Sequence, residues 1–254
     1  MTTLSTTVLP PLRRTSRRRR LATLALLATA TGGALTACSS DDGGDAPAGG
    51  DASRAGSVAL VGTFALDPGA CDGAPSGSYF RMVNSGGTLE EGPYFPNPDS
   101  SCSDPSITPI APGTDGGLVT GGYQPSPDPA FDDQGNAQAD GITAPAGFAA
   151  IQFGLSTQET DPQTGTEVPA PEILAADGEL SGQITAWSAS WNSLYFNQGS
   201  PKPDGSSPGL TAPVSGTYDE ETGRFVLEWA SAVVDGPFNG FTGVWHLEGT
   251  FTPA

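Results

Sequence analysis

Apolar and polar residues alternate in short runs along this chain, which is the pattern of β-strands that bury one face against a core. The clearest runs cover residues 224–230 and 244–251, and less regular ones cover 57–66, 78–83, 147–155 and 179–196, the last long enough for two strands. No segment carries a sustained apolar repeat at helical spacing. Glycine and proline, 35 and 24 residues, separate the runs. The pattern predicts an all-β domain, an antiparallel sandwich or a barrel-like fold, over residues 56–254.

The two clearest runs predict a hairpin whose turn is centred on Pro237. In that register Trp229 faces Trp245 on the core side, and Glu228 faces His246 on the other side. An aromatic pair of this kind stabilises a sheet by about 0.5–1.5 kcal/mol beyond its burial. A second hairpin is expected just before it, because residues 218–225 have a turn composition that includes glycine.

Residues 88–146 fit the strand pattern poorly. They hold few large apolar residues, and their prolines disfavour helices and inner strands. We therefore expect a long Pro/Gly-rich loop insertion, which is either a functional loop pinned by Cys102 or a partly mobile cover.

The N-terminal segment has the organisation of an export signal. Six arginines precede an apolar run at 21–34, which as a helix at ~1.5 Å per residue spans about 21 Å and is too short for a ~30 Å hydrocarbon core. The next residues, Leu35-Thr36-Ala37-Cys38, resemble the lipobox of bacterial lipoprotein precursors. A composition rich in Ala, Gly and Pro with one lysine is typical of actinobacteria.

The resemblance implies cleavage before Cys38, attachment of a diacylglycerol to its sulfur and acylation, for example with palmitate, of the new amine. Residues 1–37 would then be a lipoprotein signal peptide, and residues 38–55 the lipidated cysteine and a flexible acidic tether. The partner of this anchor is the lipid bilayer, and the location is the extracytoplasmic face of the cell membrane. Two alternatives stay open: secretion with Cys38 free, and export by the twin-arginine route through residues 16–21 instead of the general secretory route.

Removal of the signal leaves a very acidic protein. Four basic residues remain against 28 acidic ones, a formal net charge of −24. Such a surface repels nucleic acid and anionic headgroups, so neither is expected as a partner. It attracts cations, among them calcium, and it also serves the solubility of an exported protein.

Two cysteines besides Cys38 belong to the folded part. In an oxidising compartment Cys71 and Cys102 are expected to form a disulfide, and closing a loop of that size stabilises by roughly 3.7 kcal/mol on the chain-entropy model. A two-thiolate metal site is the alternative, although the only histidine is distant in sequence.

Three groups of side chains are candidates for ligand chemistry. His246 and Glu248 share a strand face, and Glu228 is expected opposite His246. These three residues are candidates for an acid–base or metal cluster, or for an ion pair on the solvent face of the sheet. An irregular calcium site is a second candidate, formed by Asp128, Asp132, Asp133 and Asn136, which miss the EF-hand spacing. Trp187, Trp191 and Tyr195 recur every four residues. Trp187 and Trp191 are either core residues or a platform for a sugar ring.

No catalytic residues or resident cofactor are predicted from these patterns. A Gly-x-Ser-x-Gly match at 205–209 places Pro208 after the serine, where a hydrolase needs a main-chain N–H. The expected function is a non-catalytic binding or structural role at the cell surface, with an unidentified surface ligand or protein partner. The alternatives are a carbohydrate- or peptide-binding module and a hydrolase of another type.

Overall fold

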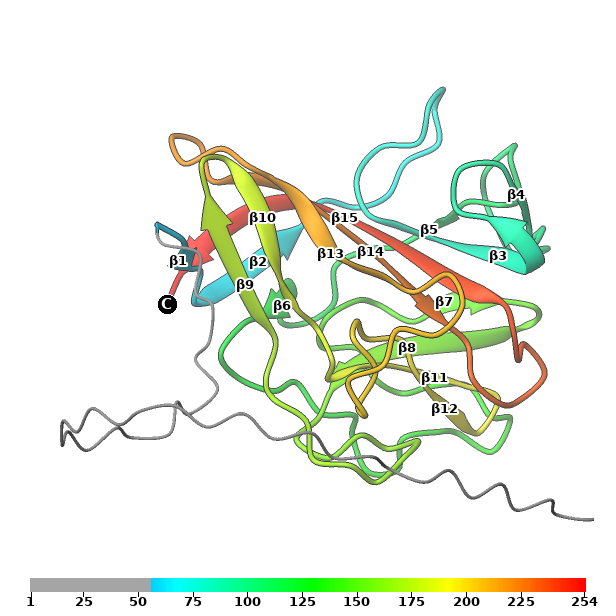
Figure 1. The fold of residues 1–254 in the computed structure, drawn as a ribbon. Coiled ribbons are helices and arrows are strands. Elements are labelled where there is room, and N and C mark those ends of the chain that lie inside the picture. The colour runs from blue at the N-terminus through cyan, green and yellow to red at the C-terminus, as the bar shows by residue number, and fades with distance from the viewer. Residues whose placement is uncertain (1–55) are drawn as a thin grey trace, which may run out of the picture. The chain divides into compact units, whose positions relative to one another are not determined.

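The computed structural model describes residues 56–254, and Cys38 with the predicted signal and tether lies outside them. The described residues form strands, turns and loops, with no helix among them (Figure 1). The strands are β1 (Val58–Ala59), β2 (Gly62–Leu66), β3 (Tyr79–Thr88), β4 (Gly92–Tyr94), β5 (Thr108–Pro109), β6 (Gly117–Val119), β7 (Ala146–Phe148), β8 (Ile151–Thr157), β9 (Glu172–Ala176), β10 (Glu179–Gln183), β11 (Trp187–Trp191), β12 (Leu194–Asn197), β13 (Ala212–Tyr218), β14 (Arg224–Ala232) and β15 (Thr242–Pro253).

All pairings between these strands are antiparallel, which confirms the predicted all-β class. Eleven strands form one curled sheet in the order β1-β9-β10-β13-β14-β15-β2-β6, with β3 joined to β15 and carrying β4 and β5. The other four form a second sheet, β12-β11-β8-β7. The long strand β15 is shared, because its first half pairs with β3 and its second half with β2 (Figure 1). The curl produces the barrel-like shape.

The hairpin of β14 and β15 has the predicted register. Trp229 lies opposite Trp245, and Glu228 lies opposite His246. Trp187 of β11 packs edge-on against both indoles, with centroid distances of 5.1 and 5.5 Å. The two sheets therefore meet through tryptophan side chains at the centre of the core.

The second predicted hairpin is also confirmed. Tyr218 of β13 pairs with Phe225 of β14, and Gly223 in the turn between them has a φ of 72°. A residue with a side chain is strained at that φ, which explains the glycine.

The expectation of two strands over 179–196 was wrong, since β10, β11 and β12 all lie there. Asn192 and Ser193 take φ values of 50° and 59° and make a two-residue turn between β11 and β12. Tyr195 therefore lies on the strand that follows the turn, where it pairs with Ser190, and does not continue the strand of Trp187 and Trp191.

The segment 88–146 is mostly loop, with only β4, β5 and β6 as strands. It nevertheless contributes to the core through Ile110, Leu118 and Ile142, which are almost fully buried. The disulfide Cys71–Cys102 joins the loop before β3 to the loop before β5, as predicted. This crosslink helps to hold a segment that has little regular hydrogen bonding of its own.

Candidate functional site

The candidate site lies on the face of β14, β15 and β3 that points away from the tryptophan core. His246 is in the middle of β15, and Nδ1 of its ring is 2.7 Å from Oε1 of Glu228 on β14. On the other side of β15, Tyr79 of β3 pairs with His246, and the two rings stack with centroids 4.5 Å apart and planes 12° apart. The imidazole is thus held between a carboxylate and a phenol ring.

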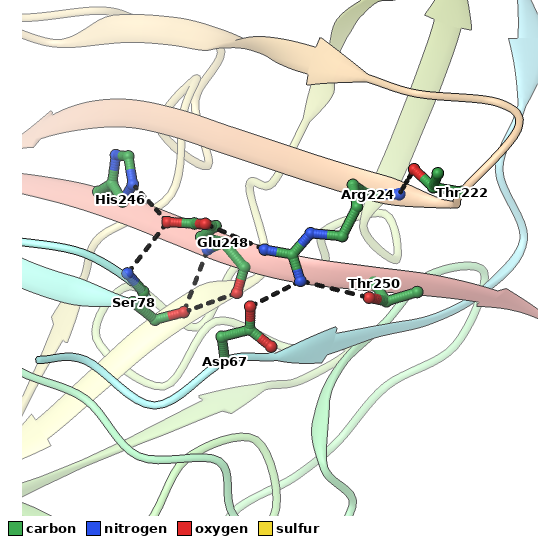
Figure 2. A network of polar contacts seen from close by, with 8 residues as sticks. Asp67, Ser78, Thr222, Arg224, His246, Glu248 and Thr250 are labelled. Carbon is green, nitrogen blue, oxygen red and sulfur yellow. Dashed lines mark hydrogen bonds and ion pairs between the residues drawn. The ribbon is translucent and has the colours of Figure 1, made fainter.

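Glu248 extends this arrangement along β15. Its Oε2 lies 3.9 Å from Nε2 of His246 and accepts a hydrogen bond from the main-chain N–H of Gly77 at 3.0 Å. Its Oε1 accepts a hydrogen bond from Arg224 at 3.0 Å. Ser78 bonds through its hydroxyl to the main-chain N–H and carbonyl of Glu248 (Figure 2). The carboxylate of Glu248 is consequently fixed from three directions.

Arg224 connects Glu248 to Asp67, which begins the loop that follows β2. Its Nη1 donates to Asp67 at 2.7 Å, and its Nη2 donates to Glu248 (Figure 2). The Asp67 and Glu248 carboxylates raise the pKa of the guanidinium. Because both acids and the arginine are partly exposed, each such pair adds only about 0–1 kcal/mol to stability.

We call the following residues the β15 polar face: Asp67, Tyr79, Arg81, Arg224, Glu228, His246 and Glu248. The guanidinium of Arg81 lies 3.4 Å from the ring centroid of Tyr94. The face holds two of the three Lys and Arg residues of the part of the chain that the structure describes, together with its histidine. Most basic groups of the described part of this acidic protein therefore gather on one face, where Asp67, Glu228 and Glu248 pair with Arg224 and His246.

The pKa values of this face follow from its contacts. The hydrogen bond from His246 and the charge of its ring lower the pKa of Glu228. Partial burial raises the pKa of the Tyr79 phenol, and the nearby Glu228 carboxylate adds to the increase. The ionised form of Glu228 is therefore the favoured partner of the imidazole.

The predicted trio of His246, Glu248 and Glu228 does come together, but the two carboxylates lie on opposite ring nitrogens. Glu248 is also engaged by Arg224 and by a main-chain N–H. Across residues 56–254, no group of three or more His, Cys, Asp or Glu side chains is arranged to hold a metal ion. The geometry is that of a network of ion pairs.

Of the four residues of the predicted calcium site, Asp132 and Asn136 bind each other in a turn at the surface. The carboxylate of Asp132 accepts hydrogen bonds from the main-chain N–H groups of Gln134 and Asn136, both at 2.8 Å, and from the Asn136 amide at 2.9 Å. These bonds lower the pKa of Asp132. Asp128 and Asp133 lie nearby in sequence and are exposed.

The packing of Trp187 and Trp191 favours the core interpretation over its alternative, a sugar platform. Trp187 is completely buried, so it offers no ring face to a ligand. Trp191 is partly buried, and its Nε1 donates a 2.7 Å hydrogen bond to the carbonyl of Phe148. The interpretation of these residues as core is the one that the packing supports.

One polar cluster has no counterpart among the sequence-based candidates. Lys202, Asn197, Asp161 and Ser231 are all buried and hydrogen-bonded to one another or to shared neighbours. They come from three separate stretches of the chain, so their meeting depends on the tertiary structure. The one available signal was that Lys202 is the single lysine of the chain.

No helix among residues 56–254 is long and apolar enough to cross a membrane. No family model, no curated protein and no solved structure matches the chain.

Proposed function

We propose that this chain is an extracytoplasmic lipoprotein, held in the bilayer by acylated Cys38, whose folded part has a non-catalytic binding or structural role at the cell surface. Three observations support this proposal: the lipobox resemblance at 35–38, the Cys71–Cys102 disulfide, and the β15 polar face. Disulfides persist in oxidising compartments, so the second observation agrees with the first.

The contacts of the two ring nitrogens of His246 are the observation that supports a non-catalytic role. Nδ1 faces Glu228 and Nε2 faces Glu248, so both nitrogens are directed to carboxylates. A general base for a hydrolase needs one nitrogen directed to a hydroxyl or a water next to the substrate. The hydroxyl of Ser78 is occupied by the main chain of Glu248. This arrangement favours recognition over hydrolysis.

The β15 polar face is the proposed contact surface. It combines guanidinium, imidazole, carboxylate and phenol groups on neighbouring strands, and these groups can bond the hydroxyls of a carbohydrate or the amides and carboxylates of a peptide. Its strands are fixed by the core beneath, so the surface is preorganised and loses little conformational entropy on binding.

Anchoring is tested by fractionating cells that express the full-length chain or its Cys38→Ser variant. The proposal expects the wild-type chain in the membrane fraction, released by detergent, and the variant in the medium. A wild-type chain recovered from the cytosol, or a variant that stays membrane-bound, would overturn the lipid anchor.

Binding is tested with the soluble Cys38→Ser chain and insoluble bacterial cell-wall material. We expect sedimentation with the cell wall to fall at least tenfold when Arg224→Glu and His246→Ala are added. Glu167→Gln, an exposed substitution away from this face, serves as the control and should bind normally. Equal sedimentation of all three proteins would reject the β15 polar face as the contact surface.

A further inference from the structure

A second site lies in the protein interior, where the end of β12 meets the loops around residues 161 and 202 and the end of β14. Lys202 is 6% exposed, Asn197 is 2% exposed and Asp161 is 1% exposed. An amine, a carboxamide and a carboxyl group are thus enclosed together. Buried charges are costly unless they are paired or chemically removed.

The amine of Lys202 is held against the residue that carries the carboxamide. Its Nζ donates to the main-chain oxygen of Asn197 and to Oγ of Ser231, each at 2.7 Å. The hydroxyl of Ser231 in turn donates to the carbonyl of Gly199 at 2.7 Å. These bonds fix the lysine head group at Asn197.

Burial also changes the reactivity of this amine. It lowers the pKa of Lys202 to about 8, with the Asp161 charge opposing part of the decrease. About one-tenth of the amine is then neutral at neutral pH, which is far more than for an exposed lysine. A desolvated neutral amine is a competent nucleophile.

The carboxamide of Asn197 has polar partners at both ends. Its Nδ2 donates to Oδ2 of Asp161 and to the carbonyl of Thr185, both at 2.8 Å. Its Oδ1 accepts the main-chain N–H of Gly199 at 3.1 Å. A donor at Oδ1 can stabilise negative charge that develops on this oxygen, and a carboxyl group at Nδ2 can deliver a proton to it.

The position of Asp161 is itself fixed. Its Oδ1 accepts hydrogen bonds from the main-chain N–H and the hydroxyl of Thr164, both at 2.8 Å. Oδ2 is therefore directed to Asn197. The four elements of an acyl transfer, which are nucleophile, acyl carbon, oxyanion donor and acid–base, are therefore gathered at one residue, Asn197.

We propose that Lys202 and Asn197 become joined by an intramolecular amide bond that the folded chain forms by itself. Nζ of Lys202 turns from the main-chain oxygen to Cγ of the same residue and attacks it, and the oxyanion forms on Oδ1 facing Gly199. Asp161 accepts a proton from the attacking nitrogen and gives it to Nδ2. The Cγ–Nδ2 bond then breaks, one ammonia leaves, and no oxidant or cofactor is needed.

In the product the buried ammonium has become a neutral amide, and the segment from Asn197 to Lys202 closes into a ring. The Asp161 carboxylate keeps its hydrogen bonds from Thr164. Release of ammonia makes the step effectively irreversible in dilute solution. This modification is independent of the β15 polar face, and it stands or falls separately from the surface role.

Mass spectrometry tests the proposal directly on the full-length protein. Cleavage after glutamate gives a fragment of residues 180–220 that contains both partners. After folding and incubation at mildly alkaline pH, the mass of this fragment should be lower by one ammonia than the mass calculated from its sequence. Its tandem mass spectrum should lack the ions that come from backbone cleavage between the two linked residues. A wild-type fragment of full mass overturns the proposal.

Three variants distinguish ammonia that is lost when this bond forms from ammonia that is lost in other reactions. Lys202→Arg keeps the charge and removes the amine, Asn197→Ala removes the acyl carbon, and Asp161→Asn keeps the shape and removes the acid–base. All three should give the full mass for their sequences. A reduced mass that persists in Lys202→Arg would place the loss elsewhere, for example in a succinimide, and would reject the bond.

Discussion

Trp229 and Trp245 face each other across β14 and β15, with ring centroids 6.0 Å apart and planes 16° apart. Trp187 closes this group from the other sheet. This aromatic layer lies directly beneath the β15 polar face and supports its strands.

Replacing Trp245 with alanine should therefore lower the free energy of unfolding by about 3–5 kcal/mol, because it empties a fully buried site. Urea unfolding followed by circular dichroism measures the loss. The control is Trp191→Ala, which removes a half-buried ring and should cost less. Equal losses in the two variants would contradict the central position of Trp245.

The second prediction concerns Gly243, which lies on β15 like Trp245. A Cβ at Gly243 would lie 2.1 Å from Oε1 of Gln198, so Gly243→Ala should destabilise the fold by about 1–3 kcal/mol through overpacking. Adding Gln198→Ala should recover part of that loss, because it removes the clashing amide. A double-mutant cycle of urea midpoints checks this, and strictly additive losses would show that the two residues do not compete for space.

The disulfide gives a third prediction. Changing Cys71 and Cys102 together to serine should lower stability by roughly 3–4 kcal/mol, because the unfolded chain regains the freedom of the loop between them. Differential scanning calorimetry of the variant measures it. Unchanged stability would mean that the segment 88–146 is held by its core contacts alone.

The pH dependence of Glu228 gives a fourth prediction. Its pKa is lowered in the folded protein by His246, so the unfolded chain binds more protons just below pH 4.5, and stability rises with pH across that window. Wild type should exceed Glu228→Gln by under about 1 kcal/mol above this window, since the pair is partly exposed, and the difference should vanish as the pH falls through the folded pKa. A difference that grows in acid would contradict the assigned sign.

Alternation predicts the strands well where one face is buried. The β14–β15 register could be read from the sequence because a shift by one residue would have moved Trp229, Leu227 and Phe225 into solvent. The β11–β12 turn was missed because an aromatic run masks it, although Asn192-Ser193 is a suitable pair for a tight turn.

The sites were harder to predict than the strands. His246 and Glu228 could be placed together because a hairpin is local. Arg224 at the start of β14 and Asp67 just after β2 are far apart in sequence and meet only in the folded chain. The cluster around Lys202 depends on loop conformations that leave no periodic pattern.

The mass of the most N-terminal peptide of the protein purified from membranes tests whether Cys38 carries an acyl anchor. We predict a peptide that begins at Cys38 and is heavier than its sequence by a diacylglycerol, with or without a further acyl chain such as palmitate on the amine. A peptide that begins upstream of Cys38, or that begins there with an unmodified thiol, would show that the chain is not anchored through this cysteine.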